Sequence, residues 1–258
     1  MKKFSRIPES LDEMTFSQFT KLLKFEGGLV AELVELWSGM DFDMCLNYVE
    51  QHDMTWIDAD AIMKSIQSES VPESVSISDI DCKVKSDLME EWFGLKMVTS
   101  GLLSTGDDNR LDVIPAVLAN YFCQDVYAYY SQKNVSELTE IISEMPANIV
   151  YPLGLHYAEM IAKLNEYQSN ALVMDEGYRT QQGREKRNLM QSFGVQRLER
   201  FGDMNLIDDF CTAFQAYRHD DVFKLEFAFV IDRLSRIEII NNLTEQLTQH
   251  YHDQAKKQ

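Results

Sequence analysis

The chain has 258 residues, of which 45 % are hydrophobic and 11 % aromatic. That composition predicts a folded chain with a sizeable core and excludes an intrinsically disordered one. The 42 acidic residues outnumber the 24 basic ones, and the formal net charge at pH 7 is -18. A surface of this charge repels phosphate backbones, so we expect no nucleic acid as the main partner.

One local stretch departs from the acidic composition. Residues 179–200 contain only two acidic residues, Glu185 and Glu199. The basic residues there are Arg179, Arg184, Lys186, Arg187, Arg197 and Arg200. The pattern favours a solvated helix or linker, and it assigns no partner to the stretch.

The cysteines and the apolar runs indicate the cellular compartment in which the protein is expected. Cys45, Cys82, Cys123 and Cys211 lie far apart and form no C-x-x-C pair, so we expect reduced thiols in a cytosolic compartment and no zinc site. The segment "MKKFSRIPESLDEM" has no apolar run and does not read as a signal peptide. No window approaches 18 uninterrupted apolar residues, so we expect no membrane span.

The first block, residues 1–66, is predicted to be helical. The apolar periodicity predicts helices over 14–25, 29–37, 41–52 and 56–66. Residues 67–86, rich in Ser, Glu and Pro, form a connector. Within it, Val75, Ile77 and Cys82 alternate with polar residues, which predicts a short hairpin or a single edge strand.

The central block, residues 87–165, carries the densest apolar pattern. Helices are predicted over 87–103, from Val113 onward, over 136–146 and over 151–164. Asp112 is expected to cap the second of these, which should be buried on most of its circumference, with Pro115 in its first turn. Ser136 is expected to open the third helix, and Pro152 to lie in the first turn of the fourth.

The remaining chain is predicted to hold a polar arm, residues 166–189, and a C-terminal helical block and tail, residues 190–258. A helix over 205–217 and a turn over 218–221 precede one long helix from Val222. Its apolar residues recur at steps of three and four and predict one stripe: Phe223, Phe227, Val230, Leu234, Ile237, Ile240, Leu243 and Leu247. Residues 250–258 are expected to form a polar tail.

The predicted fold class is therefore mainly α, with multi-helix bundle-like domains and at most one short β-hairpin near residues 74–86. The stretches "MTFSQFTKLL" and "LMEEWFGLKMV" both place aromatic residues shortly after a methionine. This similarity suggests an internal duplication.

Motifs for catalysis are missing from the sequence. It contains no G-x-x-x-x-G-K-[ST], no G-x-G-x-x-G and no G-x-S-x-G. Cys123 falls inside the predicted buried helix, and His156-x-x-Glu159 is the reverse of a di-iron motif. We therefore expect no enzyme, no catalytic residue, no metal and no cofactor. A small helical enzyme built on carboxylates distant in sequence stays open as a lesser alternative.

The order of several stretches resembles a known family. Over residues 8–165 these are "PESLDEMTFSQFTKLLK", "LVELWSGMD", "DLMEEWFGLKMVTSGL", "LDVIPAVLANYF", "EIISEMP" and "YPLGLHYAEMIAKL". A looser likeness continues in "FGDMNLIDDFCTAF" and "VFKLEFAFVIDRLSRIEI". Together they resemble the tail assembly chaperone-like proteins of siphovirus-type tailed phages, which are encoded next to the tape-measure protein.

The resemblance implies a non-enzymatic factor in the host cell cytoplasm that keeps a helical tape-measure-like partner soluble during tail assembly, with the tail-tube protein as a second partner. The alternative is a structural virion protein, such as a tail, connector or packaged internal protein. Oligomeric state is not predicted.

Two groups of side chains are expected to bind a partner. Tyr127, Tyr129 and Tyr130 exceed what one helical face can bury. Phe227, Val230, Leu234 and Ile237 lie on the long C-terminal stripe, which suits a helix-in-groove contact. For the stripe, an intramolecular core is the alternative.

Overall fold

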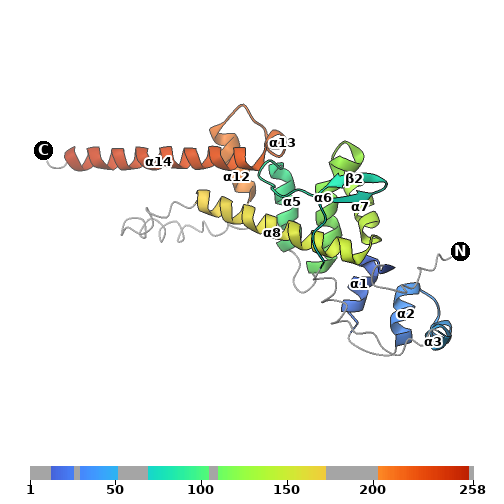
Figure 1. The fold of residues 1–258 in the computed structure, drawn as a ribbon. Helices are drawn as coiled ribbons and strands as arrows, with labels where there is room; N and C mark the ends of the chain where they lie inside the picture. Colours follow the sequence, from blue (N-terminus) through green and yellow to red (C-terminus); the bar gives the residue numbers. More distant parts are fainter. Residues whose placement is uncertain (1–12, 26–29, 52–68, 105–109, 173–202, 256–258) are drawn as a thin grey trace. The chain divides into compact units, whose positions relative to one another are not determined.

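The structure is a computed structural model that describes residues 13–25, 30–51, 69–104, 110–172 and 203–255. The chain forms two compact units (Figure 1). Unit 1 comprises Met1–Lys85 and Gly101–Glu159, and unit 2 comprises Ser86–Ser100 and Met160–Gln258. Each unit therefore combines segments from more than one of the blocks predicted from the sequence.

The described residues are mainly helical, which confirms the predicted class. The α-helices are α1 (Phe16–Leu23), α2 (Val30–Ser38), α3 (Phe42–Gln51), α5 (Phe93–Ser104), α6 (Ile114–Tyr127), α7 (Gln132–Ser143), α8 (Ala147–Leu172), α12 (Asp203–Ala213), α13 (His219–Val222) and α14 (Phe227–Ala255). A 3-10 turn, Arg110–Val113, precedes α6. Strands β1 (Ser74–Ile77) and β2 (Ile80–Lys83) form an antiparallel hairpin at the predicted place.

The hairpin is set by alternation and by its turn. Val75 pairs with Cys82, and both side chains are buried. Ser78 and Asp79 have φ of 52° and 65°. Two consecutive residues in this left-handed region are what a type I′ turn requires, so the two-residue connection closes the hairpin tightly.

The core of unit 1 lies between α6 and the first half of α8. The Tyr121 and Tyr157 rings are stacked with centroids 4.4 Å apart, and Phe122 meets Tyr157 edge-on at 5.8 Å. Most positions of α6 from Ile114 to Cys123 are buried. The expectation that this helix is core is therefore confirmed.

Helix α1 joins the same unit through its cap and its aromatic side chains. Thr15 and Gln18 form a capping box, in which the Thr15 hydroxyl accepts from the Gln18 amide and the Gln18 side chain accepts from the Thr15 amide. The Trp37 indole of α2 donates to the Gln18 carbonyl at 3.0 Å. Phe19 packs edge-on against Tyr151 of α8.

Unit 2 is built on α5, the second half of α8, and α12 to α14. Phe93 and Phe227 stack with ring centroids 6.1 Å apart, and both are fully buried. Phe210 of α12 packs against Phe214 and Tyr217. Burial of such aromatic side chains is the largest stabilising contribution available to a unit of this size.

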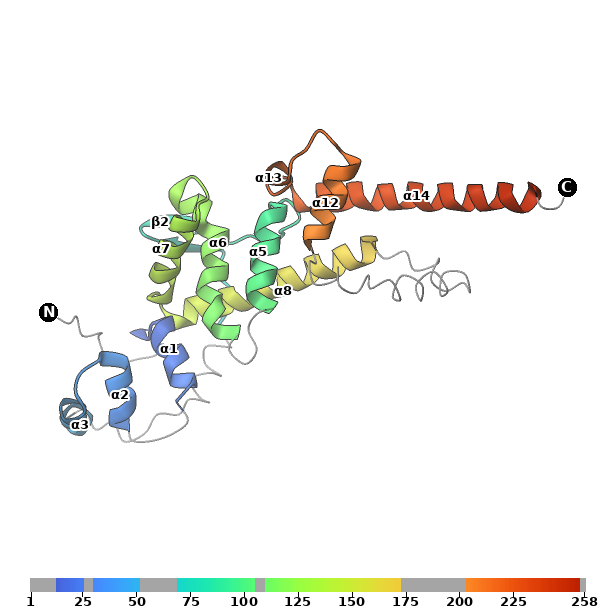
Figure 2. The same cartoon turned by 180° about the vertical axis from the view of Figure 1, so that it is seen from behind.

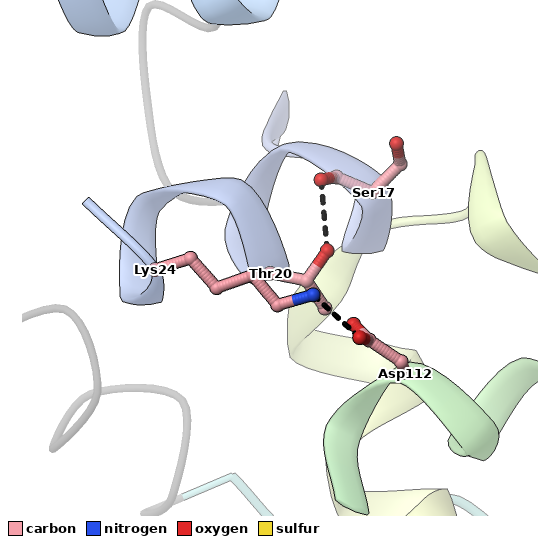
Figure 3. Close-up of polar contacts among 4 residues, drawn as sticks. All are labelled: Ser17, Thr20, Lys24 and Asp112. Atoms are coloured by element: carbon pink, nitrogen blue, oxygen red, sulfur yellow. Dashed lines mark hydrogen bonds and ion pairs between the residues drawn. The ribbon is translucent and has the colours of Figure 1, made fainter. Parts of the chain in front are cut away.

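Asp112 does not cap α6, contrary to the prediction. The residue before the helix is Val113, which makes no side-chain cap hydrogen bond, while Pro115 does lie in the first turn as predicted. Because the 3-10 turn moves Asp112 away from the helix start, its carboxylate instead pairs with the Lys24 ammonium at 2.5 Å (Figure 3). Both side chains are exposed, so this pair contributes little stability.

Two helix starts in the central block were also predicted wrongly. Helix α7 begins at Gln132, because the Ser131 hydroxyl accepts from the Asn134 amide and caps it five residues before Ser136. Helix α8 begins at Ala147, so Pro152 lies inside the helix. It also continues to Leu172, so residues 166–172 of the predicted arm are helical.

The C-terminal block also differs from the elements predicted for it. The predicted turn at 218–221 is largely occupied by α13, and most of the predicted polar tail is helical because α14 continues to Ala255. Helix α5 starts only at Phe93, since Trp92 pairs in a β-bridge with Glu226. The predicted helix over 56–66, most of the polar arm and the basic stretch lie outside the described residues.

Each of the two units contains an isolated β-bridge of the same kind. In unit 1, Thr15 and Pro146 form an isolated antiparallel bridge, and in unit 2, Trp92 and Glu226 do the same. Each bridge joins the start of a short helix to the start of a long one. The bonds in unit 1 run from the Phe16 amide to Met145 and from the Ala147 amide to Met14, at 2.9 and 2.8 Å. Those in unit 2 run from the Phe93 amide to Leu225 and from the Phe227 amide to Glu91, both at 2.8 Å.

The pattern of burial repeats as well. The buried residues of α1 and α5 correspond one to one, at a constant separation of 77 positions: Phe16 and Phe93, Gln18 and Leu95, Phe19 and Lys96, Leu22 and Thr99. Those of α14 correspond to buried residues of α8 at a constant separation of 80: Ala147 and Phe227, Val150 and Val230, Tyr151 and Ile231, Gly154 and Leu234. The units are therefore internal repeats, in which the two methionine-aromatic stretches occupy the same position.

Candidate functional site

The described side chains that could bind a metal ion do not gather at one place. Within the part of the chain that the structure describes, no group of three His, Cys, Asp or Glu side chains is placed to hold a metal ion. The His156 ring nitrogen Nε2 lies 2.9 Å from the Lys85 carbonyl oxygen, so the imidazole bonds to backbone.

The four thiols are poor nucleophiles. Burial raises the pKa of the Cys82 thiol to about 11, with the carboxylates of Asp125 and Asp81 adding to the effect. Burial also raises the pKa of Cys45, Cys123 and Cys211. Because the thiolate is the reactive form, none of these cysteines is activated for catalysis.

Thiol alkylation tests this environment. At neutral pH we expect iodoacetamide to modify Cys211 first, because it is the one cysteine of the four that is not fully buried. The buried thiols of Cys45, Cys82 and Cys123 should react only as the fold opens. Peptide mass spectrometry over a time course reads this order, and rapid native labelling of Cys82 or Cys123 would contradict it.

One pair of carboxylates comes together from different helices. Partial burial raises the pKa of Asp209 on α12, with Asp208 adding to it, and raises the pKa of Glu238 on α14, with Asp209 adding to it. Asp209 nevertheless faces solvent, and Asp208 lies 2.8 Å from the exposed His219 ring. An open surface of this kind offers no enclosed place for a substrate.

The three tyrosines after α6 take different roles. The Tyr130 hydroxyl donates to the Asn120 side-chain oxygen at 2.5 Å, and Asn120 is buried, so Tyr130 is part of the fold. Tyr127 is half-buried, whereas Tyr129 is 62 % exposed. Of the three residues predicted to meet a partner, Tyr129 is the one that the structure presents to solvent.

The four predicted binding residues on α14 lie mostly inside unit 2. Phe227, Val230 and Leu234 are buried, and Ile237 is half-buried. The intramolecular alternative left open from the sequence therefore describes the first three. A partner surface on this helix has to begin beyond them.

An exposed apolar surface does begin there. Ile239, Ile240, Leu243, Leu247 and Tyr251 are all at least half exposed. Four of them recur at steps of three and four, and we call Ile240, Leu243, Leu247 and Tyr251 the α14 stripe. Figure 2 shows α14 as one unbroken helix, which ends at Ala255.

The α14 stripe does not continue the core face of the helix. From Phe227 to Leu247 the apolar residues advance by fewer than 3.6 positions on average, so the apolar line winds about 160° around the axis. The single stripe predicted from the sequence is in fact two faces, one facing the core and one facing nearly the opposite way. The core face turns polar after Ile237, at Glu238, Asn241 and Glu245.

Neighbouring side chains extend the apolar character of the stripe. The Thr244 and Thr248 hydroxyls donate to the carbonyls of Ile240 and Thr244, both at 2.8 Å, so their polar atoms are bonded within the helix. Between residues 239 and 251 the sequence holds one Asp, Glu, Lys or Arg, which is Glu245. Depletion of charge around exposed apolar residues is typical of interaction surfaces.

Unit 1 carries a second surface, an open groove of about 160 Å³. Its apolar wall includes Val71 and Leu155, both exposed, and its lining is Glu69, Val71, Tyr151, Pro152, Leu155, His156 and Glu159. We call it the α8 groove. Sequence reasoning missed it because residues 69–71 and α8 are far apart in the chain, and it missed Tyr151 as a lining residue because that side chain reads simply as core.

No helix among the described residues has the length and hydropathy needed to cross a membrane. Comparisons of the chain with protein-family models, with curated proteins and with solved structures give no match. The function proposed below therefore depends on the surfaces of this chain and on the resemblance in its sequence.

Proposed function

We propose that this protein is a non-enzymatic assembly factor that binds an apolar helix of a protein partner on the α14 stripe. The observation that supports the proposal is the exposure of Ile240, Leu243, Leu247 and Tyr251 on a helix whose core residues face elsewhere. An amphipathic helix laid along them would bury its apolar face in the helix-to-helix mode common in peptide recognition.

The composition of the chain suits such a role. The net charge of -18 keeps a complex with an apolar partner in solution. Thirteen methionines give the chain side chains that adapt to varied partner shapes. The resemblance to tail assembly chaperone-like proteins supplies the partner, a tape-measure-like helical protein held in the host cytoplasm while the tail tube assembles around it.

Co-expression with the N-terminal region of that tape-measure protein tests the proposal. We expect the wild-type chain to raise the soluble fraction of the partner, and the double variant Leu243→Asp, Leu247→Asp to abolish the gain. Removing two buried leucines from a contact weakens binding on the order of 100-fold. The fraction of partner in the supernatant is the measurement.

The matched control is Leu46→Asp, which places the same charge on an exposed leucine of α3. It should behave as wild type. No gain in partner solubility with the wild-type chain, or an equal gain with the double variant, would refute the proposed role. Stoichiometric copies of the protein in purified particles would instead assign it to the virion structure.

A further inference from the structure

The repeated architecture shows how one long helix serves the unit that follows it. In unit 2, the second half of α8 packs on α14 and α5. The Tyr167 hydroxyl donates to Asp232 at 2.6 Å, and the Tyr167 ring lies 6.3 Å from that of Phe227. Gln168 accepts from the buried Lys96 ammonium at 2.8 Å. The C-terminal half of α8 is thus a packing element of unit 2.

The C-terminal half of α14 is the counterpart of that element. At the same separation of 80 positions, its residues replace those of α8 as follows: Ile240 for Met160, Thr244 for Leu164, Leu247 for Tyr167, Thr248 for Gln168 and Tyr251 for Ala171. In α8 these positions are buried or half-buried, whereas in α14 all five are exposed. The α14 stripe therefore has the character of a repeat interface that no described segment of this chain covers.

Unit 1 offers the surface that such a helix would meet. In unit 2 the residue that receives Tyr167 is Asp232, and its counterpart in unit 1 is Pro152. Pro152 lines the α8 groove, beside the exposed Leu155. Leu247 thus stands at the position of Tyr167, and Pro152 stands at the position of Asp232. Both positions therefore change from polar to apolar together.

The charges at the two surfaces are complementary. The α8 groove is rimmed by Glu69 and Glu159. The sequence beyond Tyr251 holds two lysines, Lys256 and Lys257, against one aspartate, Asp253, in contrast to the acidic chain as a whole. A second copy of this chain therefore brings an apolar stripe with a basic end to an apolar groove with an acidic rim.

We infer that the α14 stripe of one copy docks in the α8 groove of a second copy and reproduces there the contact that α8 makes inside unit 2. The inference goes beyond the proposed function, since it concerns the chain alone. A helical partner and a second copy then compete for the same stripe, and a second copy covers it where the protein is concentrated and no partner is bound.

The contact joins two different surfaces, so it is head-to-tail. Each copy carries one stripe and one groove, and association continues beyond a dimer unless a ring closes. A single helix seated in a shallow groove buries less than a standard interface of roughly 1,600 Å². The association is accordingly weak and depends on concentration.

Sedimentation velocity of the full chain, from micromolar to sub-millimolar concentration, tests the inference. The weight-average sedimentation coefficient should rise with concentration for the wild type. Leu247→Asp, which damages the stripe, and Leu155→Asp, which damages the groove, should each stay monomeric. Both leucines are exposed, so circular dichroism should show the wild-type helix content for both variants.

Mixing the two variants gives the decisive result. Leu155→Asp keeps an intact stripe and Leu247→Asp keeps an intact groove, so an equimolar mixture should form a discrete dimer and nothing larger. Leu46→Asp should associate as the wild type does. A wild type that stays monomeric, a mixture that stays monomeric, or a Leu155→Asp variant that associates normally would each overturn the inference.

The same variants separate this inference from the proposed function. Leu155→Asp should abolish self-association but keep the gain in partner solubility, because it leaves the stripe intact. Loss of partner holding in the wild type, with self-association retained, would refute the proposed function alone. Loss of self-association with partner holding retained would refute the head-to-tail contact alone.

Discussion

Phe93→Ala is expected to lower the free energy of unfolding of unit 2 by about 3–5 kcal/mol. The side chain is fully buried, and its ring stacks on Phe227, which begins α14. Truncation leaves a cavity at the point where the bridge between Trp92 and Glu226 joins the two helix starts. Hydrogen exchange read by mass spectrometry should show lost protection in α5, α12 and the first half of α14.

The repeat supplies the matched comparison for this variant. Phe16 is the counterpart of Phe93, so Phe16→Ala should cost a similar amount but remove protection from α1 and α8 in unit 1. Val98→Ala, at an exposed position of α5, should change little. If Phe93→Ala lowered protection equally in both units, the division of the chain into separate units would be wrong.

Gly154→Val is expected to destabilise unit 1 by about 3 kcal/mol, at the upper end of the usual cost of overpacking. A Cβ atom at this position would clash with Cγ2 of Ile114 and lie 2.9 Å from its Cδ1, and Ile114 is buried at the start of α6. Neither helix can move away without opening the contact between Tyr121 and Tyr157. Chemical denaturation followed by circular dichroism measures the loss.

Two further variants isolate the cause of that loss. Ile114→Ala removes the three carbons that the valine adds, so the double variant should recover part of the stability and be less destabilised than the sum of the single changes. Gly101→Val introduces the same side chain into a helix where a Cβ meets nothing within 4 Å, and should cost little. Additive effects at Gly154 and Ile114 would show that their contact is not the cause.

The local elements followed closely from sequence periodicity. Helix α1 buries Phe16, Phe19 and Leu22 as their spacing predicts, and the alternation of Val75 and Cys82 produces the short hairpin. Errors fell at helix ends, because these are decided by distant partners. Trp92 is extended because it pairs with Glu226, 134 positions further along the chain.

The candidate surfaces were predicted only in part. Ile240, Leu243 and Leu247 were recognised as apolar positions on a helix, but their face was assigned to the same stripe as Phe227 and Val230. A step pattern of threes and fours does not distinguish a straight stripe from one that winds around the axis. Tyr251 was missed because the residues around it are polar.

The sequence by itself determined the helical class, the hairpin, the buried character of α6 and the lack of catalytic motifs, because periodicity and composition act over a few turns of chain. Tertiary structure alone decided which face of α14 is buried, which tyrosine after α6 is exposed, and that Pro152 and Leu155 line a groove with Val71. These features depend on which distant segments pack together. In the sequence, the two methionine-aromatic stretches show only a faint similarity. In the structure, the units that contain them have corresponding β-bridges and corresponding buried positions.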